Sequence, residues 1–309
     1  MSARSIRDGR APRIATATVL HANPTGFAAA SSAPSPARRA LIILFALLAA
    51  LVLAVGAASP ASAAGKGKGG GGGGGGTSHS TSVSYAALGD SYAAGQGAGS
   101  YLNTTCYVSS KGYPKVIDAS TSITLAAEPA CSGDATAQVI GRQVPLIPTA
   151  TQYVTLTVGG NDVDFENVMQ NCFVLVSATA CTTAIAAGDA MVADGTITAR
   201  ISATVTAIKT RAPGAKVIVT GYPQLFAPTY TKAYAQQVNT STLALNAAIS
   251  TGATAAGARY VDVVAAFAGH GIGSSSPWIN NWNWLNFSAG FHPNATGYTA
   301  YAAAIKTAW

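Results

Sequence analysis

Five short apolar segments constrain the fold of this 309-residue chain more than any other feature of its sequence. They are rich in β-branched residues and do not alternate strictly between apolar and polar positions, as expected of strands covered on both faces. The segments are Val83–Leu88, Ile123–Ala126, Tyr153–Val158, Lys216–Thr220 and Arg259–Val263. Helical patterns separate most of them, above all in Ala184–Arg211, Ala233–Ala256 and Pro293–Trp309. This alternation predicts an α/β fold, a three-layer α/β/α sandwich around a five-stranded parallel sheet.

The start of the chain differs in composition from the rest. Residues 1–39 are polar and carry six arginines, and residues 40–56 are almost purely apolar. The small residues Ala61–Ala64 follow, as in the cleavage site of a secretory signal. We therefore interpret residues 1–64 as an export segment and expect a secreted, extracellular protein. Because the apolar run is close to the minimum length of a membrane span, an uncleaved anchor at the cell surface is the alternative.

A glycine-rich stretch separates this segment from the rest of the chain. It begins GKGKGGGGGGGG at Gly65, and glycine at this density does not hold a fixed structure. Residues 65–82 are thus a predicted flexible linker, and residues 83–309 are the predicted catalytic domain. The length of this last part fits one domain.

The net charge of +7 does not indicate a nucleic-acid partner. Eight of the 18 basic residues and one of the 11 acidic residues lie in residues 1–76. The remainder of the chain carries ten of each and is neutral overall. A protein that binds nucleic acid needs a basic surface, which this composition does not supply.

A candidate nucleophile follows the first apolar segment, in Gly89–Asp90–Ser91. Asn161 follows the third segment in the same way. Parallel sheets bind ligands at the carboxyl ends of their strands, so we expect Ser91 and Asn161 to lie at the binding edge. A serine also needs a base. His292 is the candidate base, whereas His270 is expected to be a loop residue and His79 lies in the predicted linker.

Four sequence blocks resemble the GDSL, or SGNH, family of serine hydrolases, which is named for a Ser, a Gly, an Asn and a His in separate blocks. They read AALGDSYAAGQGAG around Ser91, ACSGDAT around Gly133, VTLTVGGNDVDF around Asn161 and FHPNATGY around His292. The resemblance covers roughly residues 83–309 and is greatest to the secreted actinobacterial lipase, esterase and phospholipase branch. It implies a flavodoxin-like SGNH hydrolase fold and a reaction that needs no metal or organic cofactor.

The resemblance also implies a role for each residue. Ser91 would attack an ester carbonyl and form an acyl-enzyme, and His292 would act first as base and then as acid. The backbone N–H groups of Ser91 and Gly133 and the side-chain amide of Asn161 would form the oxyanion hole. We expect Asp90 to hold the tight turn, and Asp162 and Asp164 to cap the helix after Asn161.

The sequence departs from the family pattern at the triad acid. Many relatives have an aspartate three residues before the histidine, where this chain has Ala289, and no acid follows Asp262. We therefore predict a Ser–His dyad in which a backbone carbonyl accepts the Nδ1–H of His292. That carbonyl is predicted to belong to Ala289, with Gly290 as the alternative. Asp262 reaching the imidazole is a further alternative.

Four cysteines lie in the part expected to be exported, where oxidising conditions favour disulfides. Cys106, Cys131, Cys172 and Cys181 allow three pairings. The resemblance favours the nearest-neighbour pairs Cys106–Cys131 and Cys172–Cys181. Free buried thiols are the alternative.

The expected substrates are carboxylic esters, lipid acyl esters above all. Aromatic residues that could line an acyl groove, or serve ordinary packing instead, are Tyr92, Tyr101, Tyr107, Trp278, Trp282 and Trp284. The other functions that the sequence allows are a carbohydrate acetylesterase and an inactive lipid- or glycan-binding protein on the same scaffold. We expect transient contact with a lipid interface, no nucleic-acid partner and a monomer.

Overall fold

A computed structural model describes residues 82–119 and 122–309 of the chain. The predicted export segment 1–64 lies outside the described residues, as does the predicted linker apart from Ser82. Among the described residues, no helix combines the length and the apolar character needed to cross a membrane.

The five predicted strands form one parallel sheet in the order β4-β1-β5-β6-β7. Their bounds are β1 Val83–Gly89, β4 Ile123–Ala127, β5 Tyr153–Thr157, β6 Lys216–Thr220 and β7 Arg259–Val261. The central strands are the most deeply buried, and Tyr85–Leu88 of β1 has no exposed surface. Burial on both faces explains why the segments of β1, β5 and β6 read as continuous apolar runs. The prediction is wrong for the edge strand β4, whose residues alternate between half-buried and exposed.

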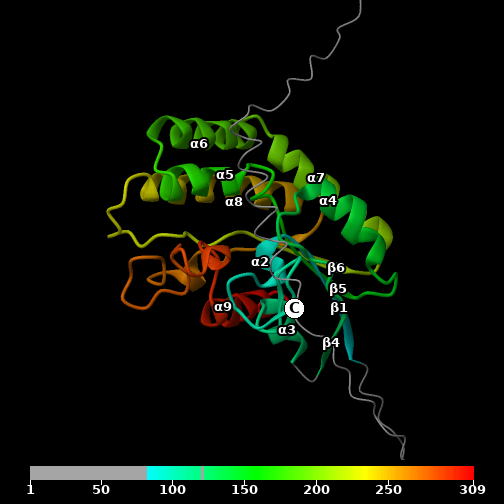
Figure 1. Cartoon of the computed structure of the whole chain (residues 1–309). Helices are drawn as coiled ribbons and strands as arrows, with labels where there is room; N and C mark the ends of the chain where they lie inside the picture. The colour runs from blue at the N-terminus through cyan, green and yellow to red at the C-terminus, as the bar shows by residue number, and fades with distance from the viewer. Residues whose placement is uncertain (1–81, 120–121) are drawn as a thin grey trace, which may run out of the picture. The chain divides into compact units, whose positions relative to one another are not determined.

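Helices cover both faces of the sheet, which confirms the predicted three-layer sandwich (Figure 1). The helices are α2 Ser91–Ala94, α3 Tyr113–Asp118, α4 Thr136–Gln138, α5 Phe165–Met169, α6 Ala178–Ala193, α7 Thr196–Arg211, α8 Ala235–Ala255 and α9 Ala295–Lys306. The α3 and α9 helices pack together on one face, and α7 packs against α8 on the other.

Two predicted helices differ from the observed ones. The segment Ala184–Arg211 is not one helix, because Gly195 adopts a φ of 83° between α6 and α7. A glycine takes this left-handed conformation without steric cost, so the chain turns there. In the last helix Pro293 is not in the first turn, because Asn294 is the N-cap and its side chain accepts the N–H of Gly297 at 3.0 Å.

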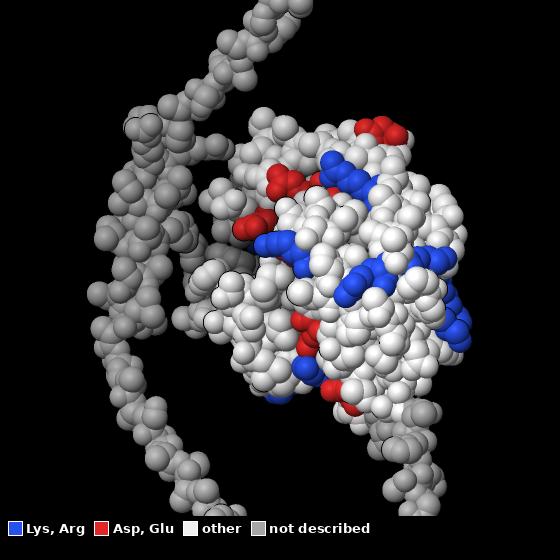
Figure 2. All heavy atoms as spheres, turned by 90° about the vertical axis from the view of Figure 1, so that its right-hand side faces the viewer, with Lys and Arg blue, Asp and Glu red and all other residues white. Residues whose placement is uncertain are grey.

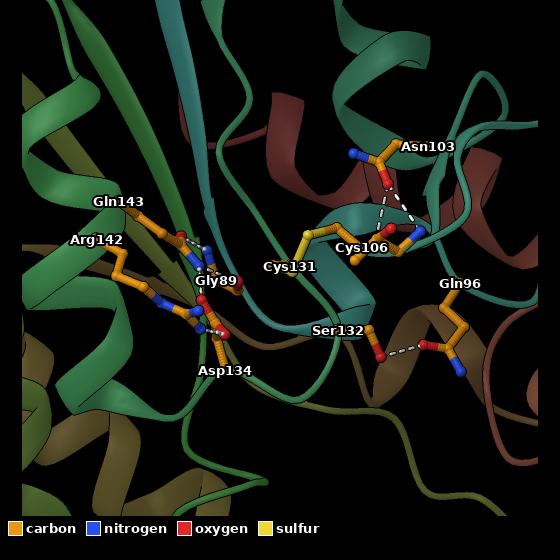
Figure 3. Close-up of a disulfide and its surroundings, with 10 residues drawn as sticks. Gly89, Gln96, Asn103, Cys106, Cys131, Ser132, Asp134, Arg142 and Gln143 are labelled. Atoms are coloured by element: carbon orange, nitrogen blue, oxygen red, sulfur yellow. Dashed lines mark hydrogen bonds and ion pairs between the residues drawn. A yellow bond between two sulfur atoms is a disulfide. The ribbon is translucent and has the colours of Figure 1, made fainter. Parts of the chain in front are cut away.

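Two features lie outside the central sheet. Strands β2 Tyr101–Asn103 and β3 Val108–Ser109 form an antiparallel pair that the sequence did not predict. The disulfides Cys106–Cys131 and Cys172–Cys181 are both present, so the predicted pairing is confirmed. The first of them ties the turn between β2 and β3 to the loop after β4 (Figure 3).

Candidate active site

The four residues of the sequence blocks lie on loops that leave the sheet or precede α9. Ser91, Gly133 and Asn161 follow the carboxyl ends of β1, β4 and β5. His292 lies between β7 and α9, about 200 residues along the chain from Ser91. The fold brings this histidine back to the strand ends where the other three are placed.

The side chains of Ser91 and His292 are in hydrogen-bond contact. Their Oγ and Nε2 atoms lie 2.8 Å apart, and the Nδ1 atom of His292 lies 2.8 Å from the carbonyl oxygen of Gly290. A carbonyl oxygen only accepts, so the proton of the neutral ring sits on Nδ1. The Nε2 atom is then free to accept the hydroxyl proton of Ser91.

The carbonyl beside the ring belongs to Gly290, and the prediction of Ala289 is wrong. The carbonyl of Ala289 instead accepts the backbone N–H of His292 at 3.2 Å. Phe291 has a φ of 64°, and this turn sends the carbonyl of Gly290 back toward the imidazole. Asp262 does not serve as the alternative partner, because its exposed carboxylate accepts the backbone N–H of Val264 at 2.8 Å.

The surroundings of His292 favour its neutral form. Burial lowers the pKa of His292 to about 4, although the hydrogen bond to Gly290 acts in the opposite direction. Removal from water penalises the charged imidazolium more than the neutral ring. At neutral pH the imidazole can therefore take up a proton, as a general base must.

Two residues hold the loop of His292 in place. The hydroxyl of Tyr92 donates to the carbonyl of Phe291 at 2.7 Å, and its ring lies 5.3 Å from the imidazole. Asn280 donates its backbone N–H and its side-chain amide to the carbonyl of His292, at 2.9 and 3.0 Å. Since Tyr92 follows Ser91 directly, the candidate nucleophile and the candidate base share one support.

The backbone N–H groups of Ser91 and Gly133 are available as donors. Ser91 is the first residue of α2 and so has no acceptor within the helix. Around Gly133, the N–H groups of Cys131, Ser132 and Asp134 all donate to backbone carbonyls, whereas that of Gly133 donates to no atom of the described residues. Gly133 is exposed and has a φ of 84°, and a Cβ there would meet open space.

The amide of Asn161 is oriented by one of its own hydrogens. Its Nδ2 atom donates to the carbonyl of Asp134 at 3.0 Å, directly after Gly133. An amide nitrogen carries two hydrogens, so a second one remains for a ligand. Asn161 and Ser91 line the same hollow in the surface. The predicted site residues therefore come together at one place.

Gln143 joins two of these loops, and sequence reasoning missed it (Figure 3). Its side chain exchanges two hydrogen bonds with the backbone of Gly89, both 2.8 Å long, and its Nε2 atom donates to Asp134 at 2.8 Å. Arg142 pairs with the same carboxylate. Gln143 is buried and lies 54 residues from Gly89 along the chain, so no local pattern marks it.

Gln96 makes a similar link near the histidine. Its Oε1 atom accepts the hydroxyl of Ser132, and its Nε2 atom donates to the carbonyl of Ser288, both at 2.5 Å. The loop before Gly133 and the loop before His292 are therefore held by one side chain. Figure 3 shows Gln96 pointing toward Ser132 beside the disulfide.

Tyr222, which follows β6, joins the serine loop to the asparagine loop. Its hydroxyl donates to Asp90 at 2.5 Å and accepts the backbone N–H of Gly160 at 2.9 Å. Asp90 also accepts the N–H of Tyr92 at 2.9 Å, so it holds the turn as the sequence predicts. Burial raises the pKa of Asp90 to about 7, against the effect of the hydrogen bonds from Tyr222 and Tyr92.

Neither aspartate after Asn161 caps the following helix with its side chain, so this prediction is wrong. Asp162 accepts hydrogen bonds from the backbone and hydroxyl of Thr136, at 3.0 and 2.6 Å, and pairs with Arg200 at 3.0 Å. It therefore supports the start of α4 rather than the helix after Asn161. Asp164 is the N-cap residue of that helix, α5, but its side chain makes no capping bond.

An apolar crevice begins beside Ser91. The first hollow includes Ser91 and Asn161 and is walled by Phe165, Thr242 and Leu245. A second hollow shares these three residues and lies between α5, α6 and α8. Among the six aromatic candidates from the sequence, Tyr92 lines the first hollow and none lines the second. The residues at the far end, such as Ile185 and Val238, are apolar and were not predicted.

Other aromatic candidates pack elsewhere. Tyr101 contacts Tyr107, with ring centroids 5.2 Å apart. The ring of Trp278 stacks on His270 at 3.5 Å, and His270 bonds the carbonyl of Ser276 at 2.7 Å. His270 is thus a loop residue, as expected.

The sequence matches the GDSL-like lipase/acylhydrolase family over residues 87–300. It is 36% identical over 220 residues to Lipase 1 of Streptomyces coelicolor, and the match covers 69% of this chain and 81% of that protein. It is 34% identical over 224 residues to a lipase of Streptomyces rimosus, which covers 70% of this chain and 82% of that protein.

Two solved structures have the same architecture. The extracellular lipase of Streptomyces rimosus has a TM-score of 0.68 and 33% identity, covering 74% of this chain and 100% of that chain. Phospholipase A1 of Streptomyces albidoflavus NA297 has a TM-score of 0.68 and 33% identity, covering 73% of this chain and 99% of that chain. The matched range includes Ser91, Gly133, Asn161 and His292.

Proposed function

Because this chain belongs to the GDSL-like lipase/acylhydrolase family and is a carboxylic ester hydrolase, we propose that it is a secreted enzyme that cleaves lipid acyl esters with a Ser–His dyad. The observation that carries the dyad is the 2.8 Å contact between Ser91 Oγ and His292 Nε2. The carbonyl of Gly290 takes the place of a triad acid.

In the first half of the reaction, Ser91 Oγ attacks the ester carbonyl carbon while His292 Nε2 takes the hydroxyl proton. The carbonyl oxygen becomes an oxyanion in the tetrahedral intermediate. The imidazolium then gives its proton to the leaving alcohol as the carbon–oxygen bond breaks. The acyl group remains on Ser91 as an ester.

In the second half, water attacks the acyl-enzyme and His292 Nε2 takes its proton. Collapse of the second tetrahedral intermediate returns that proton to Ser91 Oγ and releases the carboxylic acid. The carbonyl of Gly290 keeps the ring in one tautomer throughout. A neutral carbonyl stabilises the imidazolium less than a carboxylate does, so we infer that this enzyme depends strongly on its oxyanion hole.

The oxyanion hole consists of the N–H groups of Ser91 and Gly133 and the amide of Asn161. The unused N–H of Gly133 and the spare hydrogen of Asn161 support this assignment. Each donor is fixed before substrate arrives, through Gln143, Tyr222 and the Cys106–Cys131 bridge. Donors that need no reorganisation stabilise developing charge most effectively.

The acyl chain lies in the crevice that runs from Ser91 past Phe165 and Leu245. An apolar crevice that starts at the nucleophile fits a hydrocarbon chain better than a sugar, which favours lipid esters over acetylated carbohydrates. The lipase and phospholipase A1 names of the similar Streptomyces proteins support the same substrate class. Secretion is supported by the signal-like composition of residues 1–64 and by the extracellular lipase of Streptomyces rimosus.

A fluorophosphonate probe tests the dyad directly, because it reacts only with an activated serine. We expect labelling of the parent chain at Ser91, located by peptide mass spectrometry, and none of the Ser91→Ala variant. A His292→Ala variant that remains folded should label at least 100-fold more slowly. Labelling of folded His292→Ala at the parent rate would contradict the dyad.

A further inference from the structure

The segment that leads into His292 carries a cluster of exposed apolar side chains. Trp284 is 79% exposed, Leu285 99% and Phe287 67%, and we call these three residues the apolar tip. The other large exposed apolar residues of the described part lie elsewhere in the sequence, such as Leu146 at 63%. Neighbouring exposed groups of this size mark an interaction surface rather than ordinary surface variation.

The apolar tip is also free of charge. No Asp, Glu, Lys or Arg occurs anywhere in residues 263–305, which surround it in the sequence. Elsewhere the surface carries both signs, as Figure 2 shows for the face on the right of Figure 1, whereas the segment with the tip belongs to the orange loop on the left. A surface without charge can enter an apolar layer without the cost of desolvating an ion.

The segment is built as a folded projection. The side chain of Asn283 accepts the backbone N–H groups of Leu285 and Asn286, both at 3.0 Å. Trp282 packs against the core at the base of the segment, and its ring lies 4.7 Å from that of Trp284. Because these local bonds satisfy the backbone, the three apolar side chains can be presented outward together.

The projection is joined to the catalytic machinery. Gln96 donates to the carbonyl of Ser288 at 2.5 Å, and Gly290 and His292 follow within four residues. A surface that bound the tip would therefore be held next to the dyad. Lipid esters form such surfaces, since they aggregate into micelles, droplets and bilayers.

We propose that Trp284, Leu285 and Phe287 insert into the surface of an aggregated, zwitterionic or uncharged lipid ester and hold the active site against it. This proposal rests on the proposed function, because a lipid ester is its substrate. Tryptophan suits the role, since its ring settles at the boundary between headgroups and acyl chains. The absence of charge means that the attachment is apolar and independent of ionic strength.

The test measures the insertion of one labelled position into a lipid surface, and it does not depend on enzymatic activity. In the full chain carrying Ser91→Ala, to prevent hydrolysis, Leu285→Cys is labelled with nitrobenzoxadiazole, and Leu146→Cys with the same dye is the matched exposed control. With phosphatidylcholine vesicles we expect at least a twofold rise in emission at position 285, quenched by spin-labelled lipid and equal at 0.05 and 0.5 M NaCl. We expect no change at position 146. No rise at 285, or an equal rise at both positions, would overturn the proposal.

A kinetic measurement separates this proposal from the proposed function. The triple variant W284S/L285S/F287S should hydrolyse soluble p-nitrophenyl butyrate within twofold of the parent but emulsified tributyrin at least tenfold more slowly. Leu146→Ser should leave both rates unchanged. If the proposed function is wrong, the parent hydrolyses neither ester, and the dye signal remains. If this proposal is wrong, both esters are hydrolysed, but the dye signal and the difference in tributyrin hydrolysis between parent and triple variant are absent. A parent dimer that the triple variant converts to a monomer, with no response to vesicles, would assign the tip to a second copy and overturn the proposal.

Discussion

Gln143 and Gly89 exchange two hydrogen bonds of 2.8 Å, one from the backbone N–H of Gly89 to Oε1 and one from Nε2 to the carbonyl of Gly89. The pair of bonds resembles those between neighbouring strands, but here a side chain from the helical segment Val139–Gln143 makes them. It fixes the residue two positions before the nucleophile. The third bond of Gln143, to Asp134, fixes the residue after Gly133.

Replacing Gln143 tests how far this link positions the oxyanion donors. Gln143→Met keeps the size of the side chain but removes the acceptor of the buried N–H of Gly89 and the donor to one carboxylate oxygen of Asp134. We expect the free energy of unfolding to fall by about 2–4 kcal/mol, measured by urea denaturation. In the folded fraction kcat should fall by about tenfold with KM nearly unchanged, because the donors are displaced. Unchanged stability together with unchanged kcat would show that Gln143 is dispensable.

The hydroxyl of Tyr222 links the serine loop to the asparagine loop. Tyr222→Phe removes it and leaves the N–H of Gly160 and one oxygen of Asp90 without that partner. We expect a loss of about 1–3 kcal/mol in unfolding free energy and a lower kcat. Thermal denaturation and p-nitrophenyl butyrate hydrolysis measure the two effects. Tyr230→Phe is a control away from this link, and an equal loss of kcat in both variants would contradict the role of Tyr222.

The low pKa of His292 predicts the pH at which kcat/KM is lost on the acidic side, which we call the acidic limb. The base must be neutral, and burial lowers its pKa to about 4, so activity is lost as the pH falls through that value. We expect kcat/KM for p-nitrophenyl butyrate to stay high at pH 5 to 6, with the fold checked by tryptophan fluorescence. A limb near the ordinary pKa of about 6.5 would contradict this account.

Asp90 can give the pH profile a second acidic limb, at higher pH, and the two limbs must be told apart. Its pKa is raised to about 7 by burial, and it lies directly before Ser91. In the Asp90→Asn variant the limb assigned to His292 should remain at the same pH. A limb that disappears with Asp90 belongs to the carboxylate instead.

Asp262→Asn tests the absence of a triad acid. Its carboxylate accepts the N–H of Val264, and an asparagine oxygen can accept the same bond. We therefore expect kcat to stay within twofold of the parent value. The free energy of unfolding should change by no more than about 0.5 kcal/mol. A loss of several orders of magnitude in kcat would overturn the dyad and restore a catalytic aspartate.

The crevice beside Ser91 predicts a dependence on acyl-chain length. Thr242 lines both hollows and is partly exposed, so Thr242→Phe should block the passage between them. We expect kcat/KM for p-nitrophenyl palmitate to fall by at least tenfold, with the acetate ester nearly unaffected. Thr240→Phe places the same ring at an exposed position of α8 and should change neither. An equal loss for acetate and palmitate would indicate general damage to the site.

Much of this site could be predicted from the sequence because each of its parts lies in a local pattern. A strand that ends in a small-residue turn predicted where Ser91 and Asn161 stand, and the sheet followed from the buried strands. The turn at Gly195 was not predicted, because the apolar pattern of Ala184–Arg211 continues through it. The glycine at this position was the one local indication that the helix ends there.

Other features depend on contacts between distant segments or on one backbone angle. Gln143 and Gln96 act on residues that lie tens to hundreds of positions away, and no spacing rule marks them. The choice between the carbonyls of Ala289 and Gly290 was decided by the positive φ of Phe291, which its residue type does not predict.

The bridge between Cys106 and Cys131 ends two residues before Gly133, so its formation restrains the loop that carries a proposed oxyanion donor. A newly made chain in a reducing cytoplasm lacks this tether, and its oxyanion donor is less firmly held. If the chain is exported as we propose, oxidation after export would complete the site. With the proposed lipid substrates, this order of events would spare the membranes of the cell that makes the enzyme.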